Sequence, residues 1–102
     1  MVVMEKRINL LGEEHFDTLQ SMANLACTYR EQGRWKEAEA LEVVVMEKRK
    51  NLLGEEHLDT FTSMKNLACT YRGQGRWKEA EALEVVVIEK RTHALEENQN
   101  LI

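Results

Sequence analysis

The chain has 102 residues, of which 31% are charged, and its formal net charge is −4 at pH 7. This length suits one small domain with a modest core, and the mildly acidic balance argues against nucleic acid, because phosphate binding requires a basic face. Since no run of 18 apolar residues and no secretory signal pattern occur, we expect a cytoplasmic protein with no membrane partner.

Proline is absent and helix-forming residues dominate, which predicts an all-α fold. The stretch "GRWKEAEALEVVV" begins at Gly33 and again at Gly75, so the sequence repeats with a period of 42 residues. Such a period is typical of an α-solenoid, in which each unit stacks on its neighbour. We therefore predict one array with a half repeat at 1–16, a repeat at 17–58 and a repeat with a C-terminal helix extension at 59–102.

The two copies are nearly identical over the 42 aligned positions. The seven pairs that differ are Met1/Val43, Ile8/Lys50, Phe16/Leu58, Leu19/Phe61, Gln20/Thr62, Ala23/Lys65 and Glu31/Gly73. A third, partial copy begins at Val85 and ends after Arg91.

The pattern predicts five helices, at about 1–11, 17–32, 35–53, 59–74 and 77–98. The first is the second half of a unit and lacks the helix that should pack against it. Its apolar residues would then be exposed, which favours self-association by end-to-end stacking or by exchange of a helix. These residues are Val2, Val3, Leu10 and Leu11.

The helix predicted at 17–32 has one apolar face. Asp17 or Thr18 is suited to cap its N-terminus, and Gly33 follows where a left-handed C-terminal residue is needed. A turn this short makes the next helix antiparallel. The apolar face comprises Leu19, Met22, Leu25, Ala26 and Tyr29.

The helix predicted at 35–53 places Ala38, Leu41, Val45 and Leu52 on one stripe and ends at Gly54. Its run of three valines, from Val43, favours a strand in isolation. Because the run lies inside a long helical pattern, we expect packing to override that local preference. The same interpretation applies 42 residues later.

The segment "NLACTYREQGRWKEAEAL" resembles the tetratricopeptide repeat family. The signature residues appear in order: Met22, Leu25, Ala26 and Tyr29 on the first helix, then Gly33, Trp35 and Ala38. The family's usual unit has 34 residues, and the longer unit here, with the loop "LLGEEHxDT", is similar to the kinesin-light-chain subclass. Two departures are Phe16 and Leu58, where that subclass usually has proline, which leaves Gly12 and Gly54 as candidate hinges. A third is Glu42, with its counterpart Glu84, where an aromatic residue or cysteine is common.

The resemblance implies a right-handed superhelix of antiparallel helix pairs, in which Ala26 and Ala38 allow the two helices of a unit to approach closely. It also implies a concave groove, lined by the first helix of each unit, that holds an extended peptide or a helix. The implied partner-binding residues are Gln20, Ala23, Asn24, Cys27, Arg30 and Glu31, with their counterparts Thr62, Lys65, Asn66, Cys69, Arg72 and Gly73.

Helical spacing independently puts these positions on one stripe, rotated away from the apolar face. Three of the differences between the copies fall on this stripe: Gln20/Thr62, Ala23/Lys65 and Glu31/Gly73. This is expected if the stripe contacts something other than the next repeat.

Asn24 and Asn66 are the strongest candidates for peptide contact, because a side-chain amide can pair with both groups of a bound backbone. The alternative is that each amide bonds the neighbouring unit. Arg30 and Arg72 are suited either to hold a carboxylate or to pair with nearby acidic residues.

Few residues suggest chemistry. The "EEH" triplets at 13–15 and 55–57 lack the convergent partners of a zinc site, so we interpret them as solvated loops, and His93 as an isolated surface residue. Cys27 and Cys69 have no nearby base and are interpreted as free thiols. The charged runs "MEKRK" and "IEKR" are interpreted as solvent-facing. We predict no catalytic residues, no metal and no cofactor.

Two functions remain in view. The first is a protein-interaction scaffold whose groove binds a protein or peptide partner, and the second is a self-assembling repeat unit that forms a homodimer or larger oligomer. An enzyme is the least favoured class.

Overall fold

In the computed structural model, residues 16–100 are described, with side chains up to Glu97. They form four helices: α2 (Phe16–Glu31), α3 (Trp35–Leu53), α4 (Leu58–Gly73) and α5 (Trp77–Asn100). These bounds lie within two residues of the predicted helices, and no strand occurs between residues 16 and 100. The helix predicted at 1–11 lies outside the described residues. The all-α fold class is confirmed.

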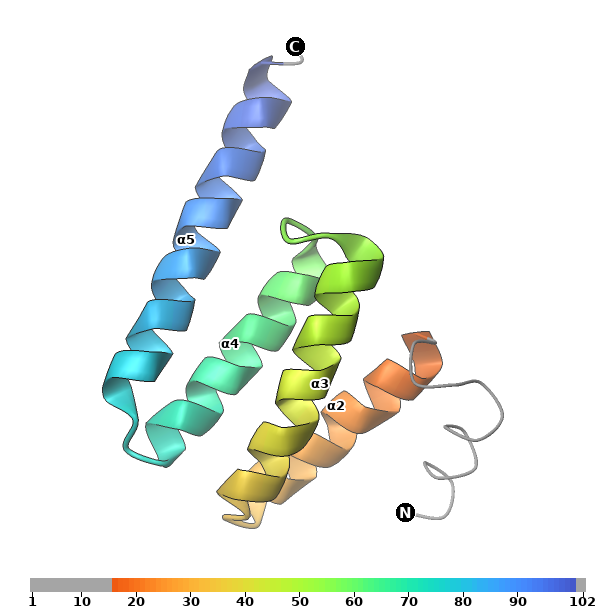
Figure 1. The fold of residues 1–102 in the computed structure, drawn as a ribbon, viewed down its shortest axis with the longest axis vertical. Helices are drawn as coiled ribbons and strands as arrows, with labels where there is room; N and C mark the ends of the chain where they lie inside the picture. Colours follow the sequence, from red (N-terminus) through yellow and green to blue (C-terminus); the bar gives the residue numbers. More distant parts are fainter. Residues whose placement is uncertain (1–15, 101–102) are drawn as a thin grey trace.

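Each helix packs against the next one along the chain, so that α2 contacts α3, α3 contacts α4 and α4 contacts α5. Successive helices run in opposite directions, and α5 is the outermost helix at one end of the row (Figure 1). The arrangement is that of stacked antiparallel helix pairs. None of the helices within residues 16–100 has the length and apolar content needed to cross a membrane.

The turns inside the two repeats are built alike. Gly33 has φ 75° and Gly75 has φ 78°, a left-handed conformation that glycine adopts without strain. Immediately after each glycine, the chain bonds back to the first helix: the Arg34 N–H donates to the Tyr29 carbonyl at 2.8 Å. The predicted role of Gly33 is confirmed, and the short turn explains the antiparallel pairing.

The alanines predicted to let the paired helices approach closely are buried. Ala26 and Ala38 are fully buried, and so are Ala68 and Ala80 in the next unit. Larger apolar side chains form two clusters, one per repeat. The first contains Leu19, Met22 and Val45, and the second contains Phe61, Met64 and Val87.

The valine run beginning at Val43 lies within α3, so packing overrides its local strand preference. Four residues expected in the core differ from the prediction: Leu52 is exposed, and Leu25, Tyr29 and Leu41 are only half-buried. Leu52, in the last turn of α3, is 43% exposed. Leu25 is only half-buried, whereas its counterpart Leu67 is 2% exposed.

The start of α4 is capped differently from the prediction. We expected the counterparts of Asp17 or Thr18 to cap it, but the cap is His57, whose Nδ1 accepts a hydrogen bond from the Asp59 N–H at 3.0 Å. The Thr60 hydroxyl instead donates to the Gly54 carbonyl at 2.8 Å. The helix begins one residue earlier than expected, which puts His57 at the capping position.

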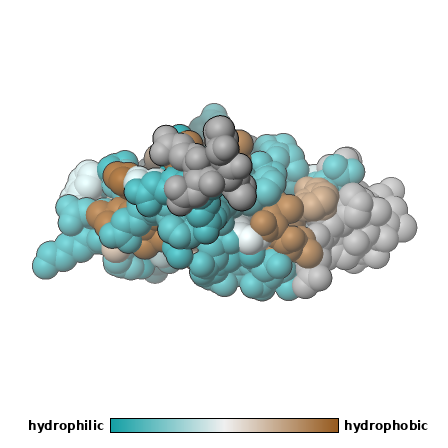
Figure 2. Space-filling view, turned by 90° about the horizontal axis from the view of Figure 1, so that it is seen from above, coloured by the Kyte–Doolittle hydropathy of each residue, from teal (hydrophilic) through white to brown (hydrophobic). Residues whose placement is uncertain are grey.

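The last helix is longer than its counterpart α3. Gly54, with φ 97°, ends α3, whereas Glu96 occupies the equivalent position in α5 and the helix continues to Asn100. Seen from above, the molecule has several separate hydrophobic areas among hydrophilic ones (Figure 2).

Candidate functional site

The twelve residues predicted to line a groove all lie on α2 or α4, and none of them is buried. Nine are exposed, and three are half-buried: Ala23, Arg30 and Asn66. The stripe predicted from helical spacing is therefore accessible in both repeats.

On α2, the stripe begins with a pair of amides. The Gln20 amide nitrogen donates to the Asn24 Oδ1 at 3.0 Å, and the Gln20 Oε1 accepts a hydrogen bond from Arg49 at 3.2 Å. Gln20 thus links the stripe to α3. Its counterpart Thr62 bonds within its own helix, with its hydroxyl donating to the Leu58 carbonyl at 3.0 Å.

On α4, the Asn66 side chain makes no hydrogen bond to any residue within 16–97, and only its backbone carbonyl accepts one, from the Thr70 hydroxyl at 3.3 Å. The amide lines a small gap between the repeats together with Ala23, Glu42, Val45 and Ser63. Both polar groups of the half-buried Asn66 amide are therefore without a hydrogen-bond partner among residues 16–97.

The first helices of the two repeats, α2 and α4, both line a hollow of about 400 Å³. Its lining comprises Cys27, Arg30 and Glu31 of α2, Trp35 of α3 and Cys69 of α4. Four of these five residues belong to the predicted stripe, so the structure brings residues from both repeats to one shallow, open hollow. Trp35 was not predicted there, although its position just after the turn is a signal that points to it.

The two arginines of the stripe pair with acidic residues in their own repeats. The Arg30 Nε lies 3.3 Å from the Glu42 Oε2, and Arg72 pairs in the same way with Glu84. Of the two roles considered for these arginines, the structure shows pairing with nearby acids. Arg30 also donates to the Cys27 Sγ at 3.5 Å, and both cysteines are free and exposed.

Glu42 is buried at the boundary between the repeats. Only 4% of it is exposed, and besides the Arg30 contact its carboxylate accepts a hydrogen bond from the Thr70 hydroxyl. Burial raises the pKa of the Glu42 carboxyl, against the opposing effects of the Thr70 hydrogen bond and the Arg30 charge. The unusual residue at this position therefore belongs to an inter-repeat contact.

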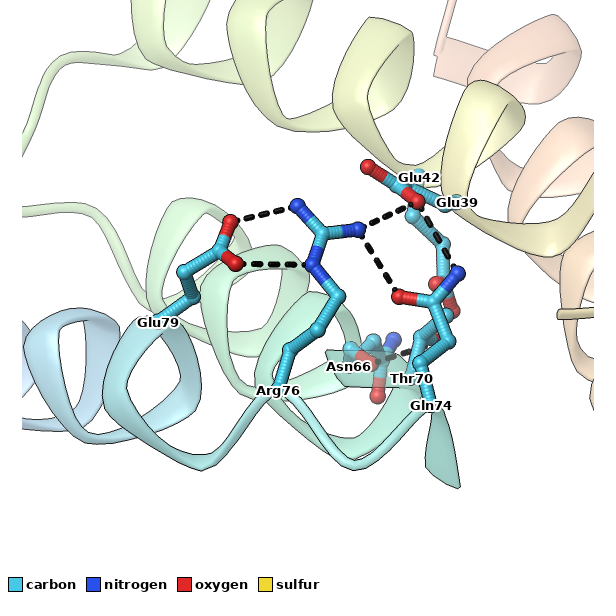
Figure 3. A network of polar contacts seen from close by, with 7 residues as sticks. All are labelled: Glu39, Glu42, Asn66, Thr70, Gln74, Arg76 and Glu79. Atoms are coloured by element: carbon cyan, nitrogen blue, oxygen red, sulfur yellow. Dashed lines mark hydrogen bonds and ion pairs between the residues drawn. The ribbon is translucent and has the colours of Figure 1, made fainter. Parts of the chain in front are cut away.

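A second polar contact crosses the same boundary near the turns (Figure 3). The Arg76 guanidinium reaches back to the Glu39 carboxylate at 2.8 Å, and the Gln74 amide donates to the same carboxylate at 3.0 Å. Arg76 also pairs with Glu79 and stacks over the Tyr71 ring, 4.2 Å from its centroid. These charge-assisted hydrogen bonds raise the pKa of the Arg76 guanidinium.

The solvent-facing interpretation of the charged run "MEKRK" is wrong for Arg49, which is 7% exposed. Its guanidinium donates to the Ser63 hydroxyl at 2.9 Å as well as to Gln20. The helix α4 of the next repeat covers it. The counterpart Arg91 has no following repeat within the described residues and is exposed.

The interpretation of His93 as isolated is also wrong. The His93 imidazole is exposed, but it pairs with Glu56 from the loop before α4 and with Glu97 one turn later on α5. The hydrogen bond that the His93 ring donates to the Glu56 carboxylate is the main cause of the raised pKa of His93. Ligand atoms of these three side chains lie within 4.8 Å of one another, an arrangement that the ion pairs themselves explain.

The family model described as tetratricopeptide repeat matches residues 18–59 and 60–100. The chain belongs to the tetratricopeptide repeat family. The two matched segments correspond to the two complete repeats, and such repeats generally mediate protein–protein interactions. No curated protein matches this sequence.

Proposed function

We propose that this tetratricopeptide repeat array is a protein-interaction scaffold that holds a peptide or a helix in the hollow between α2 and α4. The observation that carries the proposal is the hollow itself, which Cys27, Arg30 and Glu31 line from one repeat and Cys69 from the next. A ligand lying along it would contact both first helices at once.

The polar groups beside the hollow indicate how a peptide would be held. The Asn66 amide is free of hydrogen bonds to residues within 16–97, so it can donate to a backbone carbonyl and accept from a backbone N–H. Asn24 is exposed at the equivalent place and engages Gln20 through its Oδ1 only, which leaves its amide nitrogen for a ligand. Two such contacts, one repeat apart, suit an extended chain.

The experiment is a selection of binding peptides from a displayed library, followed by calorimetry with the best sequence. Replacing both Asn24 and Asn66 with alanine should weaken binding about tenfold or more, since each lost hydrogen bond costs about 1 kcal/mol. The control is Glu89→Ala, an exposed position on α5 away from the hollow. Equal affinity for the double variant and the control would contradict the proposal.

A structural role for Asn66 is separated from recognition by its effect on folding. Asn66→Ala should change the free energy of unfolding by less than about 1 kcal/mol if the amide serves recognition. A large fall in the melting temperature would instead make Asn66 a structural residue.

Self-association is a second candidate function, and the exposed apolar residues of α5 favour it. Ile88 and Leu95 are largely exposed, and so is Leu58 at the first position of α4. Sedimentation at increasing concentration tests this candidate, and a mass that stays near 11.9 kDa excludes it. Leu58→Pro, which stiffens the loop after Gly54 at a position where helices accept proline, should favour the monomer if helices are exchanged.

Three finer assignments belong to this proposal. The 42-residue unit and the loop "LLGEEHLDT" support the kinesin-light-chain-like subclass. Residues 1–102 would form a single array, and the protein would act in the cytoplasm as a scaffold without catalytic activity. The exposed thiols of Cys27 and Cys69 suit a reducing compartment.

A further inference from the structure

Three side chains of types that bind metal ions meet near the C-terminal end of α5. His93 and Glu97 lie one turn apart on α5, and Glu56 comes from the loop between α3 and α4. The His93 Nδ1 lies 2.5 Å from a Glu56 oxygen, and the His93 Nε2 lies 3.5 Å from a Glu97 oxygen. We call these three residues the His93 cluster.

The cluster depends on the longer course of α5. His93 and Glu97 are four residues apart, a spacing that places two side chains on the same face of a helix. The equivalent helix α3 ends at Leu53, and Asn51 stands where α5 has His93. Because α5 continues past the α3–α4 loop (Figure 1), it presents both groups to Glu56. Spacing along the chain does not bring the loop to this helix, so the sequence alone predicts no metal site.

The surroundings of the His93 ring favour a positive charge. The hydrogen bond to Glu56 and the charges of Glu56 and Glu97 raise the pKa of His93. The Lys90 ammonium, one turn earlier on α5, is itself paired with the Glu55 carboxylate at 3.2 Å. When the ring carries a proton, the ion pairs account for the arrangement. When the ring is neutral, the two carboxylates of the cluster are left without a cation between them.

We propose that the His93 cluster binds a Zn²⁺ ion, which takes the place of the proton on the imidazole. One ring nitrogen and one oxygen from each carboxylate would be the three protein ligands, and water would complete a tetrahedral shell. The donor set suits zinc better than calcium or magnesium, because those two ions prefer oxygen ligands alone. The bound ion would join the α3–α4 loop to the C-terminal part of α5.

The distances in the cluster are compatible with one shared ion. One ligand atom from each residue lies within 4.8 Å of the other two, whereas ligands bonded to zinc at about 2.0–2.2 Å are roughly 3.3 Å apart in a tetrahedron. Since the two ring nitrogens face different carboxylates, one carboxylate has to swing toward the nitrogen that the other one faces. The side chains of His93 and Glu97 are each 58% exposed and that of Glu56 is 31% exposed, so these rotations leave the packed core in place.

The test measures zinc binding by the whole chain in competition with a chromophoric chelator. A pH of about 8 is suitable, because protons then compete least for the ligands. The parent protein carries Cys27→Ser and Cys69→Ser, since thiols also bind zinc. We expect one equivalent of zinc per chain.

Three variants of this parent remove one ligand each: His93→Gln, Glu97→Gln and Glu56→Gln. Each should weaken zinc binding about tenfold or more, because even groups that only support a metal ligand contribute about 10–100-fold to affinity. The control is Glu81→Gln, which changes an exposed carboxylate of the same helix outside the cluster. The control should keep the affinity of the parent.

Unfolding gives a second measure that does not depend on the chelator. Saturating zinc should raise the melting temperature of the parent by at least about 4 °C, because an ion that binds only the folded chain stabilises it. His93→Gln should lose this rise, although without zinc its exposed side chain leaves the helices folded, which circular dichroism checks.

Nuclear magnetic resonance of the imidazole groups locates the ion. Zinc should shift the signals of His93 and leave those of His57, whose Nδ1 accepts a hydrogen bond from the Asp59 N–H. No binding at millimolar zinc would overturn the proposal, and so would binding that survives all three glutamine substitutions or that shifts His57 in place of His93. The cluster is separate from the hollow between α2 and α4, so these outcomes do not depend on peptide binding.

Discussion

The Thr70 hydroxyl of one repeat donates a hydrogen bond to the buried Glu42 carboxylate of the preceding repeat. In the first repeat, the same threonine, Thr28, is exposed and bonds only the Asn24 carbonyl of its own helix among the described residues, at 3.3 Å. The two threonines thus contribute differently to stability. Among the described residues, only Thr70 faces a glutamate of a preceding repeat, Glu42.

Thr70→Val should lower the free energy of unfolding by about 1.5–3 kcal/mol, because it leaves a buried carboxylate with one fewer donor. Thr28→Val is the matched control and should change it by less than about 0.5 kcal/mol, as expected of an exposed position. Urea denaturation of both variants measures the difference. Equal losses would show that the hydrogen bond to Glu42 contributes little.

Glu42→Gln should stabilise the protein relative to wild type more strongly at pH 7 than at pH 4. The pKa of Glu42 is raised in the folded state above its ordinary value of 4.5. The stability it contributes is therefore full below pH 4.5 and is lost as the pH rises through the folded pKa. A glutamine carries no charge at either pH and avoids this loss while still accepting the Thr70 bond.

Urea denaturation of wild type and Glu42→Gln at the two pH values measures the gap, that is, the difference in unfolding free energy between the two proteins. The effects of other titrating groups cancel in this comparison. The control is Glu84→Gln, since Glu84 has no covering helix within the described residues and is only half-buried. A gap that is the same at both pH values, or one that narrows as the pH rises, contradicts the prediction.

Leu67→Ala should lower the free energy of unfolding by about 2–5 kcal/mol, because Leu67 is fully buried. Leu25→Ala should cost less, since the half-buried Leu25 has less contact area to lose. Thermal or urea unfolding of the two variants gives the ranking. A larger loss for Leu25→Ala would reverse the order that the burial predicts.

Gly73→Ala should destabilise the protein by about 1–3 kcal/mol, because the added methyl group would overlap the Trp35 ring. The sign is informative, since glycine-to-alanine changes in helices ordinarily stabilise by about 1 kcal/mol. The displaced ring should also shift tryptophan emission to longer wavelength. Glu31→Ala, at the equivalent position of α2, is the control and should leave the emission unchanged.

The helices and turns could be predicted from the sequence because their signals are local. Gly33 and the spacing of apolar residues fix where α2 ends and which side of it is buried, and the surrounding pattern decides the conformation of the run at Val43. The stripe of candidate groove residues follows from the same periodicity, which is why all twelve lie on accessible sides of α2 and α4.

The inter-repeat contacts could not be predicted in the same way, because identical residues have different environments. Arg49 and Arg91 follow local sequences that differ only at Met46 and Ile88 over the seven preceding residues, yet only Arg49 is buried. The burial of Arg49 and the exposure of Leu52 depend on where the neighbouring helix crosses α3, which hydrophobic spacing within α3 does not specify. The sequence does hold one signal: Arg49 follows Trp35 and Glu42 at steps of seven residues, which places all three on one side of α3. The charge of Arg49 alone indicates a solvent-facing side chain.

The buried bond between Glu42 and Thr70 also bears on how near-identical repeats find the correct register. Apolar contacts alone tolerate sliding one helix past another by a turn, since leucine, methionine and valine substitute for one another at little cost. A slip of one turn toward the end of α4 would place the Glu42 carboxylate opposite Gly73, which has no side-chain donor, instead of the Thr70 hydroxyl. The buried charge would then lack that donor, at a cost of about 1–3 kcal/mol or more. Arg49 and Ser63 impose the same condition half a helix away, so the two polar contacts together admit one alignment of α4 on α3.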